Sequence, residues 1–332
     1  MRVLITGGGG FVGLALAQAL LEDGHGVVLF DRRPPPQVFL DAVRHAADRL
    51  SVVQGDVCSE EDIDRAFQEF GPITHVFQGA ALTAGPERES TEPLKVIDVN
   101  LNGTVRVLAA ALRFGVSRVV YASSLTVYGA HIFGDGSVSE AGTPPAPDTL
   151  YGITKYAGEC AALRLGKNRG LDVRAARIGS VFGPWEGETG ARDMVSPFAQ
   201  AASAAARGMP VVLPGVYPRR EMIYVVDLVA GLIALMTSAS PSHDYYNLSA
   251  NVDWNQALQR WCVALAAEIP GFQWRYAQAG EAATIDFYDA SPRASMDASR
   301  AMSDLGWSAR YSCDMSMAAY ARWVAGHGRY FS

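Results

Sequence analysis

The stretch Val3-Leu4-Ile5-Thr6-Gly7-Gly8-Gly9-Gly10-Phe11-Val12-Gly13 decides the fold. Residues 3–5 form an apolar run that predicts a buried strand, and the spacing over residues 11–22 predicts a helix. Gly7, Gly10 and Gly13 lack the Cβ atoms that would block a tight turn, the approach of a pyrophosphate and the packing of helix on strand. The free N–H groups at the start of the helix would then face phosphate oxygens. A glycine run alone can be an ordinary loop, but its position between a strand and a helix favours a dinucleotide site.

The first half of the chain continues this alternation. Apolar runs occur at residues 27–30, 52–53, 75–77 and 119–121, and helical patterns at residues 61–69 and 93–114. Unbroken apolar runs are typical of strands that are buried on both faces. We therefore predict an α/β fold with a Rossmann-type doubly wound parallel sheet.

The second half is organised differently. Several prolines near residue 145 interrupt the chain, and the regular alternation weakens beyond residue 184. We predict a cofactor-binding domain over residues 1–179, to which segments near 220–250 return. A smaller, partly interleaved C-terminal substrate domain would comprise most of residues 180–332.

Composition excludes several classes of function. The 28 basic and 34 acidic residues are spread along the chain without a basic run, which argues against nucleic acid as a partner. The longest apolar stretch, residues 228–236, is less than half a membrane span, so we expect no membrane contact. No stretch resembles a targeting segment.

Cysteine and histidine usage points the same way. Cys58, Cys160, Cys262 and Cys313 are far apart and form no Cys-x-x-Cys pair, as expected of reduced thiols in a cytoplasmic protein. The six histidines lack metal-ligand spacing, so we predict no metal site.

The second predicted strand ends at Asp31, 24 residues after Gly7. A carboxylate at this position can accept hydrogen bonds from the adenosine ribose hydroxyls and would repel a 2′-phosphate, which favours NAD over NADP. Arg32 follows at once and either softens this preference or is a solvated turn residue. Asp56 and Val57 follow the third strand, where Asp56 either faces the adenine or caps a helix.

Tyr151 and Lys155 are the strongest candidates for chemistry. They are four residues apart on a predicted helix, so the phenol and the ammonium share one face. A free tyrosine has a pKa near ~10, and lowering that pKa to about 7 needs roughly 4 kcal/mol. Nearby positive charge, from Lys155 and from an oxidised nicotinamide, is expected to supply this stabilisation of the phenolate.

Two hydroxyls, on Ser123 and Ser124, stand at the carboxyl end of the predicted strand over residues 119–121. Ligands bind at this edge of open α/β sheets. A hydroxyl there can hold the reacting oxygen while Tyr151 takes its proton.

In this order, the glycine run, Asp31, Ser-Ser-x-x-Val-Tyr-Gly at 123–129 and Tyr-Gly-x-x-Lys at 151–155 resemble the extended short-chain dehydrogenase/reductase family, the NAD-dependent epimerase/dehydratase group. The resemblance extends over essentially the whole chain. It implies NAD as the cofactor and Ser124, Tyr151 and Lys155 as the catalytic residues. It also implies a homodimer that packs the helices after Pro93 and Tyr151, although apolar faces on these helices are equally explained by burial within one chain.

The residues predicted to bind the cofactor are Gly7, Gly10, Phe11, Val12, Gly13, Asp31, Arg32, Asp56, Val57, Gln78, Gly79, Ala80, Asn100, Ser123, Tyr151, Lys155 and Ile178. The residues predicted to bind the substrate are Thr83, Ser124, Thr126, Ser180 and Arg220.

Several positions depart from the family pattern. Leu125 and Thr126 replace the acid–base Asp-Glu pair of the sugar-nucleotide dehydratases, which argues against dehydration. Ser180 stands where nucleotide-sugar epimerases usually have Asn. Phe287 stands roughly where those enzymes carry an Arg for the diphosphate, although Arg293 is only six residues away and can substitute for it.

These departures favour an NAD-dependent dehydrogenase that acts on a small molecule, such as a sugar, a sugar acid or another hydroxy acid. Arg220, or its neighbour Arg219, would then meet a carboxylate, unless both arginines are surface residues. An NAD-dependent nucleotide-sugar epimerase is the alternative, distinguished by the absence of NADH accumulation. A non-catalytic dinucleotide sensor is a third reading, which the intact Ser124, Tyr151 and Lys155 argue against.

Overall fold

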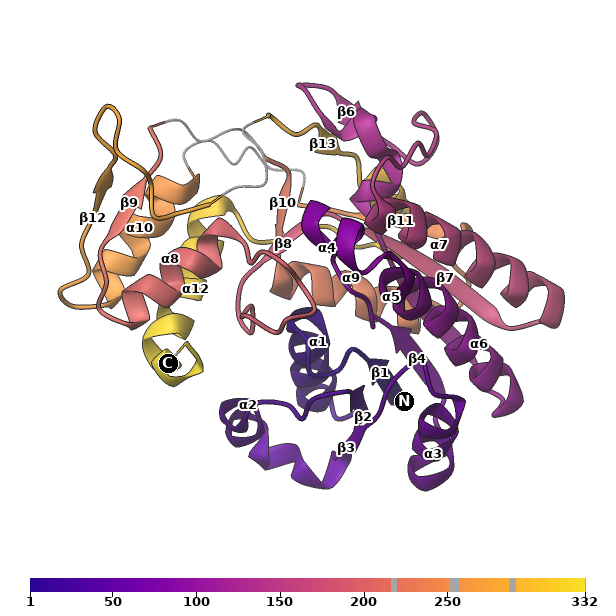
Figure 1. Cartoon of the computed structure of the whole chain (residues 1–332). Helices are drawn as coiled ribbons and strands as arrows, with labels where there is room; N and C mark the ends of the chain where they lie inside the picture. Colours follow the sequence, from indigo (N-terminus) through magenta and orange to yellow (C-terminus); the bar gives the residue numbers. More distant parts are fainter. Residues whose placement is uncertain (216–219, 251–256, 287–290, 332) are drawn as a thin grey trace.

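The computed structural model describes residues 1–215, 220–250, 257–286 and 291–331 (Figure 1). The elements of the first 178 residues are β1 (Arg2–Thr6), α1 (Phe11–Glu22), β2 (Gly26–Asp31), α2 (Gln37–Ala42), η1 (Arg44–Arg49), β3 (Leu50–Gln54), α3 (Glu60–Phe70), β4 (His75–Gln78), α4 (Pro86–Thr91), α5 (Pro93–Ile97), η2 (Asp98–Asn102), α6 (Gly103–Arg113), β5 (Arg118–Ser124), η3 (Leu125–Ile132), β6 (Ser137–Val138), α7 (Leu150–Arg169) and β7 (Asp172–Ile178). The remaining elements are β8 (Ser180–Phe182), α8 (Pro197–Ala206), β9 (Val211–Leu213), β10 (Met222–Tyr224), α9 (Val225–Thr237), β11 (Tyr245–Leu248), α10 (Ala257–Glu268), β12 (Trp274–Tyr276), β13 (Ser295–Met296), α11 (Ser299–Leu305), α12 (Cys313–Gly326) and η4 (Gly328–Tyr330).

A seven-stranded sheet in the order β11-β7-β5-β4-β1-β2-β3 forms the centre of the molecule. Every pairing within it is parallel. Strands β1 to β5 coincide with the apolar runs of the sequence, and β5 is buried along its whole length. The predicted doubly wound parallel sheet is confirmed.

Helices cover both faces of this sheet (Figure 1). One buried cluster joins it to α1, α9 and the Trp307 ring, and a second joins it to α3, α6 and α7. Helix α7 begins where Thr149 accepts a hydrogen bond from the Gly152 N–H, and it ends at Gly170, whose φ of 73° suits glycine.

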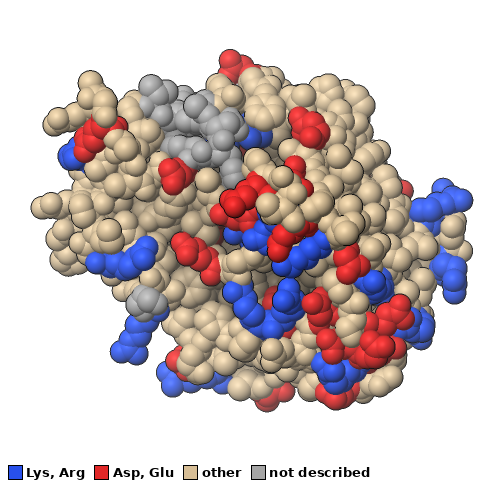
Figure 2. All heavy atoms as spheres, in the orientation of Figure 1, with Lys and Arg blue, Asp and Glu red and all other residues tan. Residues whose placement is uncertain are grey.

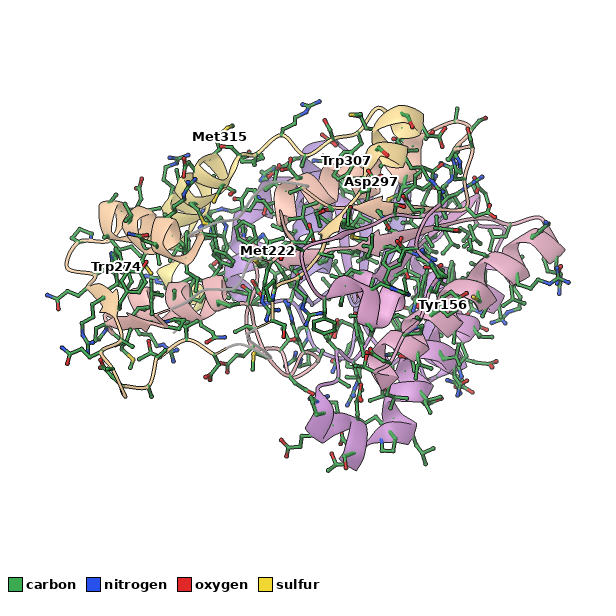
Figure 3. All side chains as sticks on the ribbon, turned by 90° about the horizontal axis from the view of Figure 1, so that it is seen from above. Tyr156, Met222, Trp274, Asp297, Trp307 and Met315 are labelled. Atoms are coloured by element: carbon green, nitrogen blue, oxygen red, sulfur yellow. The ribbon has the colours of Figure 1, made fainter. Side chains whose placement is uncertain are left out.

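The C-terminal lobe packs around its own core. The short pairs β8–β10 and β9–β12 and the helices α8, α10 and α12 surround it. The Trp261 and Tyr320 rings stack at its centre, with their centroids 4.5 Å apart. Residues 225–248 leave this lobe: α9 packs against α1, and β11 pairs with β7 at the edge of the sheet. In Figure 3, Trp274 of the C-terminal lobe and Tyr156 of α7 lie on opposite sides of the molecule.

Acidic and basic side chains are interspersed over the face that Figure 2 shows. None of the described helices is long and apolar enough to cross a membrane. Among the described residues, no group of three or more His, Cys, Asp or Glu side chains is arranged to hold a metal ion.

Trp185 joins the two lobes. Its ring meets Phe39 of α2 edge-on at 5.2 Å between centroids and Trp323 of α12 at 5.0 Å. Its indole N–H donates to Gln18 of α1 at 2.8 Å. The residue is 1% exposed and has a φ of 70°, a backbone conformation that side chains other than glycine rarely adopt. The contacts of this ring therefore hold the chain just after β8, between the sheet domain and the C-terminal lobe.

We predict that Trp185→Ala lowers the free energy of unfolding by about 3–5 kcal/mol, because it removes a buried aromatic ring and leaves a cavity between the lobes. Urea denaturation followed by circular dichroism measures this loss. Met302→Ala is the control, because Met302 is 58% exposed on α11 and should change the unfolding free energy little. Equal stability of the Trp185 variant and the wild type would contradict the assignment of Trp185 as an anchor.

Candidate active site

A cavity of about 710 Å³ opens along the carboxyl ends of the central strands. One end is lined by Asp31, the last residue of β2, and by Asp56, which follows β3; the middle is lined by Tyr151 and the glycine turn. The other end is lined by Arg220 and by residues of the C-terminal lobe. A cleft at this edge, where the strand order reverses between β1 and β4, is the usual ligand site of an open α/β sheet.

The glycine turn fits a pyrophosphate. A Cβ on Gly13 would lie 2.3 Å from the Gly7 carbonyl oxygen, so only glycine allows α1 to begin this close to β1. Gly7 has a φ of 69°, in the left-handed region. Helix α1 starts at Phe11 and directs its first N–H groups into the cavity that Gly10 and Val12 also line. These residues fit the dinucleotide that the sequence predicts.

The adenosine end is set by two carboxylates. Asp31 accepts hydrogen bonds from the Gly9 and Arg33 N–H groups, both at 3.1 Å, which hold it at the cavity wall. Asp56 lines the cavity and accepts a hydrogen bond from the Cys58 N–H at 2.9 Å. It does not cap α3, because Ser59 is the N-cap of that helix and accepts from the Asp62 N–H. The Arg32 guanidinium lies 3.4 Å from Asp56, which balances its charge.

Most predicted site residues are brought together by the fold. The predicted cofactor residues that line the cavity are Gly7, Gly10, Phe11, Val12, Gly13, Asp31, Arg32, Asp56, Val57, Gly79, Ala80, Ser123, Tyr151, Lys155 and Ile178. The predicted substrate residues Thr83, Ser124, Thr126, Ser180 and Arg220 also line it.

Gln78 does not line the cavity, contrary to the expectation from sequence. It is the last residue of β4 and is 1% exposed. Its side chain accepts a hydrogen bond from Thr6 at 2.6 Å and donates to Thr104 at 3.2 Å. The side chain therefore ties β1 to α6 behind the loop that begins at Gly79.

Asn100 also lies behind the wall. It is 1% exposed, and its amide oxygen and nitrogen bond the N–H and the carbonyl of Leu82 at 2.7 and 3.0 Å. The same nitrogen donates to Thr154 of α7 at 3.1 Å. The residue holds the cavity loop against the helix that carries the catalytic candidates, instead of contacting a ligand.

Ser124, Tyr151 and Lys155 meet at the middle of the cavity. Ser124 ends β5 and accepts hydrogen bonds from the Thr126 N–H at 3.2 Å and from the Thr126 hydroxyl at 3.0 Å. Its own hydroxyl hydrogen can still donate to a ligand oxygen. The Tyr151 N–H donates to Glu89 of α4 at 3.1 Å, which fixes the start of the helix.

The pKa values of Tyr151 and Lys155 are not shifted in the way that the sequence led us to expect. Burial raises the pKa of Tyr151, and hydrogen bonds with Thr83 and Ser124 and the charge of Arg192 only partly offset it. Burial also lowers the pKa of Lys155 to about 7. The expectation that Lys155 lowers the pKa of the phenol is therefore wrong for the protein alone, because desolvation dominates both groups and the charge that acts on the phenol is that of Arg192.

The substrate end contains residues that the sequence analysis did not select. Glu186 and Arg192 line the cavity and form an ion pair at 2.8 Å, with Glu186 1% exposed. The Thr83 N–H donates to the Ala191 carbonyl at 2.8 Å, which brings the loop against the catalytic side. No helix or strand pattern marks residues 186–193, so spacing alone could not place them.

Arg293 lines the same end of the cavity, with its guanidinium 4.1 Å from the centre of the Phe133 ring. Phe287, which the sequence alignment placed at the family's diphosphate arginine, lies outside the described residues. The possibility that Arg293 substitutes at this position is therefore compatible with its location.

Comparison with known proteins gives one family. Residues 3–249 match the model of the NAD dependent epimerase/dehydratase family. UDP-glucuronic acid decarboxylase 1 of Xenopus tropicalis is 32% identical over 240 residues, which cover 71% of this chain and 54% of that protein. A probable UDP-glucuronate 4-epimerase of Rhizobium meliloti is 30% identical over 243 residues, covering 71% and 68%. The chain thus spans about half the length of the decarboxylase.

A solved structure extends the likeness to nearly the whole chain. MoeE5 in complex with UDP-glucuronic acid and NAD has a TM-score of 0.74 and is 30% identical, and the alignment covers 97% of this chain and 98% of that one. MoeE5 has also been solved with UDP-glucose and NAD.

We predict that Tyr151→Phe lowers turnover at least about 100-fold while NAD binding changes little, because only the proton-transfer hydroxyl is lost. Turnover assays and calorimetric titration with NAD measure the two effects. Tyr156→Phe is the matched control, since Tyr156 lies on the same helix but does not line the cavity. Near-full activity of the Tyr151 variant would show that another group handles the proton.

Proposed function

The chain belongs to the NAD-dependent epimerase/dehydratase family, and from that premise we propose that it is an NAD-dependent nucleotide-sugar epimerase. The observation that carries this proposal is that Arg220 and Arg293, from two separate segments, line the cavity that holds Tyr151. A neutral sugar needs no guanidinium group. A diphosphate is bound well by such groups, because their planar N–H donors match its oxygens.

This proposal puts nucleotide sugars ahead of small substrates, the reverse of the preference from sequence, but it leaves the reaction unchanged. The sequence favoured a small substrate because Phe287 occupied the expected place of a diphosphate arginine. Arg293 in the cavity removes that argument. Hydride transfer between a secondary alcohol and NAD, the reaction expected from the sequence, is common to both readings.

We further propose that the sugar is a hexuronate. Arg192 acts electrostatically on the Tyr151 phenol, so this cation belongs to the reacting end of the cleft rather than to its far end. A carboxylate on the sugar ring would meet it there. The relatives named for UDP-glucuronate support the same class of substrate.

Dehydration does not suit this cavity. Leu125 and Thr126 line it where the dehydratases of the family carry an acid and a base. Neither an aliphatic side chain nor a threonine hydroxyl can exchange a proton at neutral pH in the way a carboxyl group does. The keto sugar would therefore be reduced again without loss of water.

The chain's residues act on the substrate hydroxyl in a fixed order. Bound oxidised NAD supplies the hydride acceptor and a positive ring that favours the Tyr151 phenolate. Tyr151 takes the hydroxyl proton, while Ser124 donates a hydrogen bond to the same oxygen and limits its movement. Lys155, as an ammonium ion, stabilises the phenolate. Tyr151 returns the proton when the opposite face of the keto group is reduced, which inverts the carbon.

We predict that incubation with NAD and UDP-glucuronate gives the 4-epimer, with a higher kcat/KM than for UDP-glucose and without stoichiometric NADH. Chromatography of the nucleotide sugars and absorbance at the NADH band measure the two quantities, with Tyr151→Phe as the inactive control. NADH equal to the substrate consumed would make the protein a dehydrogenase. A pentose product with released carbon dioxide would make it a decarboxylase, and binding of NAD without any turnover a sensor.

We also propose a homodimer in the cytoplasm. Leu94 of α5 is 81% exposed and Ile153 of α7 is 47% exposed, and these two helices pack side by side (Figure 1). Burial of such apolar side chains favours a partner on this face. Cys58, Cys160 and Cys262 are free thiols, which suits a reducing compartment.

Light scattering after size exclusion should give twice the chain mass of 35.5 kDa. We predict that Leu94→Arg together with Ile153→Arg shifts the protein to the monomer, because two charges would enter the buried face. Met302→Arg on α11 serves as the control and should stay dimeric. A wild-type monomer, or a dimer that survives the double change, would contradict this interface.

A further inference from the structure

A buried carboxylate lies directly behind the catalytic residues. Glu159 is one helical turn after Lys155 on α7 and is 2% exposed. It accepts a hydrogen bond from the Ser123 hydroxyl at 2.6 Å. It also forms a two-point ion pair with Arg177, whose Nη2 and Nε donate to its two oxygens at 2.6 and 3.1 Å.

These contacts tie together the three elements that carry the site. Ser123 is on β5 next to Ser124, Glu159 is on α7 with Lys155, and Arg177 is on β7 next to Ile178. A shift of any one element would break a hydrogen bond to a charged, buried group, which is expensive. The carboxylate therefore fixes how the catalytic groups face one another.

Arg177 cannot easily turn away from this pair. Its guanidinium lies 4.1 Å from the centre of the Tyr245 ring and 4.9 Å from that of Tyr128. Tyr128 in turn donates to Asn247 at 2.8 Å. Aromatic rings around a guanidinium restrict it to one orientation and attract its charge.

Lys155 sits in an apolar site in which Glu159 is the neighbouring charge. The ammonium lies 4.8 Å from the centre of the Tyr121 ring, and the Tyr121 hydroxyl donates to the Lys155 carbonyl at 3.1 Å. Burial lowers the pKa of Lys155 to about 7, and the charge of Glu159 opposes this effect. Without Glu159, burial alone would act on the ammonium.

Other ionisable groups surround α7. Glu89 of α4 accepts a hydrogen bond from the Tyr151 N–H at the start of the helix. On the helices and strands packed against it they are Lys95 of α5, Asp98 of η2, Arg106 and Arg113 of α6, Arg118 and Tyr121 of β5, Tyr128 and His131 of η3, and Asp172, Arg174 and Arg177 of β7; on α7 itself they are Tyr151, Tyr156, Glu159, Cys160, Arg164, Lys167 and Arg169. Among them, Tyr121, Tyr151 and Glu159 adjoin Lys155. Arg118 and Asp172 pair with each other at the opposite ends of their strands.

We propose that Glu159 is a positioning residue of this site, which keeps Lys155 an ammonium ion and holds the end of β5 in register with α7. Arg177 weakens the attraction between Glu159 and Lys155, because it shares the Glu159 carboxylate. This inference deepens the proposed function, because it concerns the residues of the same proton transfer. Its main test uses the titration of Lys155 itself and needs no turnover.

Charge changes on the two partners should act in opposite directions. Glu159→Gln removes the anion that favours the ammonium, so it should lower the pKa of Lys155 by about one or more. Arg177→Met removes the cation that competes for the same carboxylate, so it should raise that pKa. A purely structural role would not give shifts of opposite sign.

The composition of the chain makes this measurable. It has only three lysines, Lys95, Lys155 and Lys167. Protein labelled with ¹³C at lysine Cε therefore gives three resonances, and the variants Lys95→Arg and Lys167→Arg identify that of Lys155. Its chemical shift against pH gives the titration midpoint in the full chain.

Two further variants make the experiment decisive. Glu159→Gln leaves Arg177 buried without its carboxylate and can unfold the chain. The double variant Glu159→Gln/Arg177→Met removes both charges, should fold, and should place the midpoint between those of the single variants. Asp172→Asn breaks the ion pair between Arg118 of β5 and Asp172 of β7, about 16 Å along the strand from Arg177, and should leave the midpoint unchanged.

Kinetics then connect the titration with the reaction. The alkaline limb of kcat against pH should move with the Lys155 midpoint in each variant, with KM nearly unchanged. A midpoint in Glu159→Gln that does not fall below that of the wild type overturns the role of Glu159. If that variant does not fold, a midpoint in the double variant that does not fall below that of Arg177→Met overturns it. A midpoint in Arg177→Met that does not rise overturns the role of Arg177. If the midpoints shift as expected but no epimer forms, the proposed function fails and this inference stands.

Discussion

Parallel strands all end at one edge of a sheet, and the whole site depends on this constraint. The registers Thr6↔Gln78 and Ser124↔Ile178 place the ends of β1 and β4 level with each other, and those of β5 and β7 level with each other. The pairing Gln78↔Tyr121 puts the second two strand ends three residues further along the same edge. The loops that follow these strands must therefore share one space. The glycine turn lets α1 begin in that space without filling it. Each side chain at this edge is within reach of one elongated ligand.

Desolvation is the second influence on the chemistry. The cleft buries Tyr151 and Lys155 enough to favour the neutral form of both groups. Tyr151 can act as a base only if a nearby positive charge stabilises its phenolate. Lys155 provides that charge, and Glu159, behind the site, keeps Lys155 protonated. The Glu159–Arg177 pair is itself buried, which makes it costly to disturb and rigid. The same low-dielectric surroundings that suppress ionisation thus strengthen the electrostatic interactions between the few groups that remain charged.

The two lobes divide the work of binding. The sheet and its helices supply the cofactor half of the cleft and the catalytic groups. The loop that follows Trp185, the segment around Arg220 and the return through Arg293 supply the substrate half. Trp185 is packed against helices of both lobes, so the substrate loop is held relative to the cofactor half by aromatic contacts. Variation in these loops can change the substrate while the reaction stays the same.

The sequence by itself determined the parallel sheet, the glycine turn, the carboxylate after β2 and the shared face of Tyr151 and Lys155. Each of these depends on periodicity or on spacing over a few residues, which local backbone geometry converts directly into position. Only the tertiary structure decided that Gln78 and Asn100 support the wall from behind, and that Arg192 and Arg293 reach the same cavity. It also decided that Tyr151 and Lys155 are buried enough for desolvation to govern the pKa of each group. Burial and contacts between distant segments follow from packing of the whole chain, and no local pattern in the sequence encodes them.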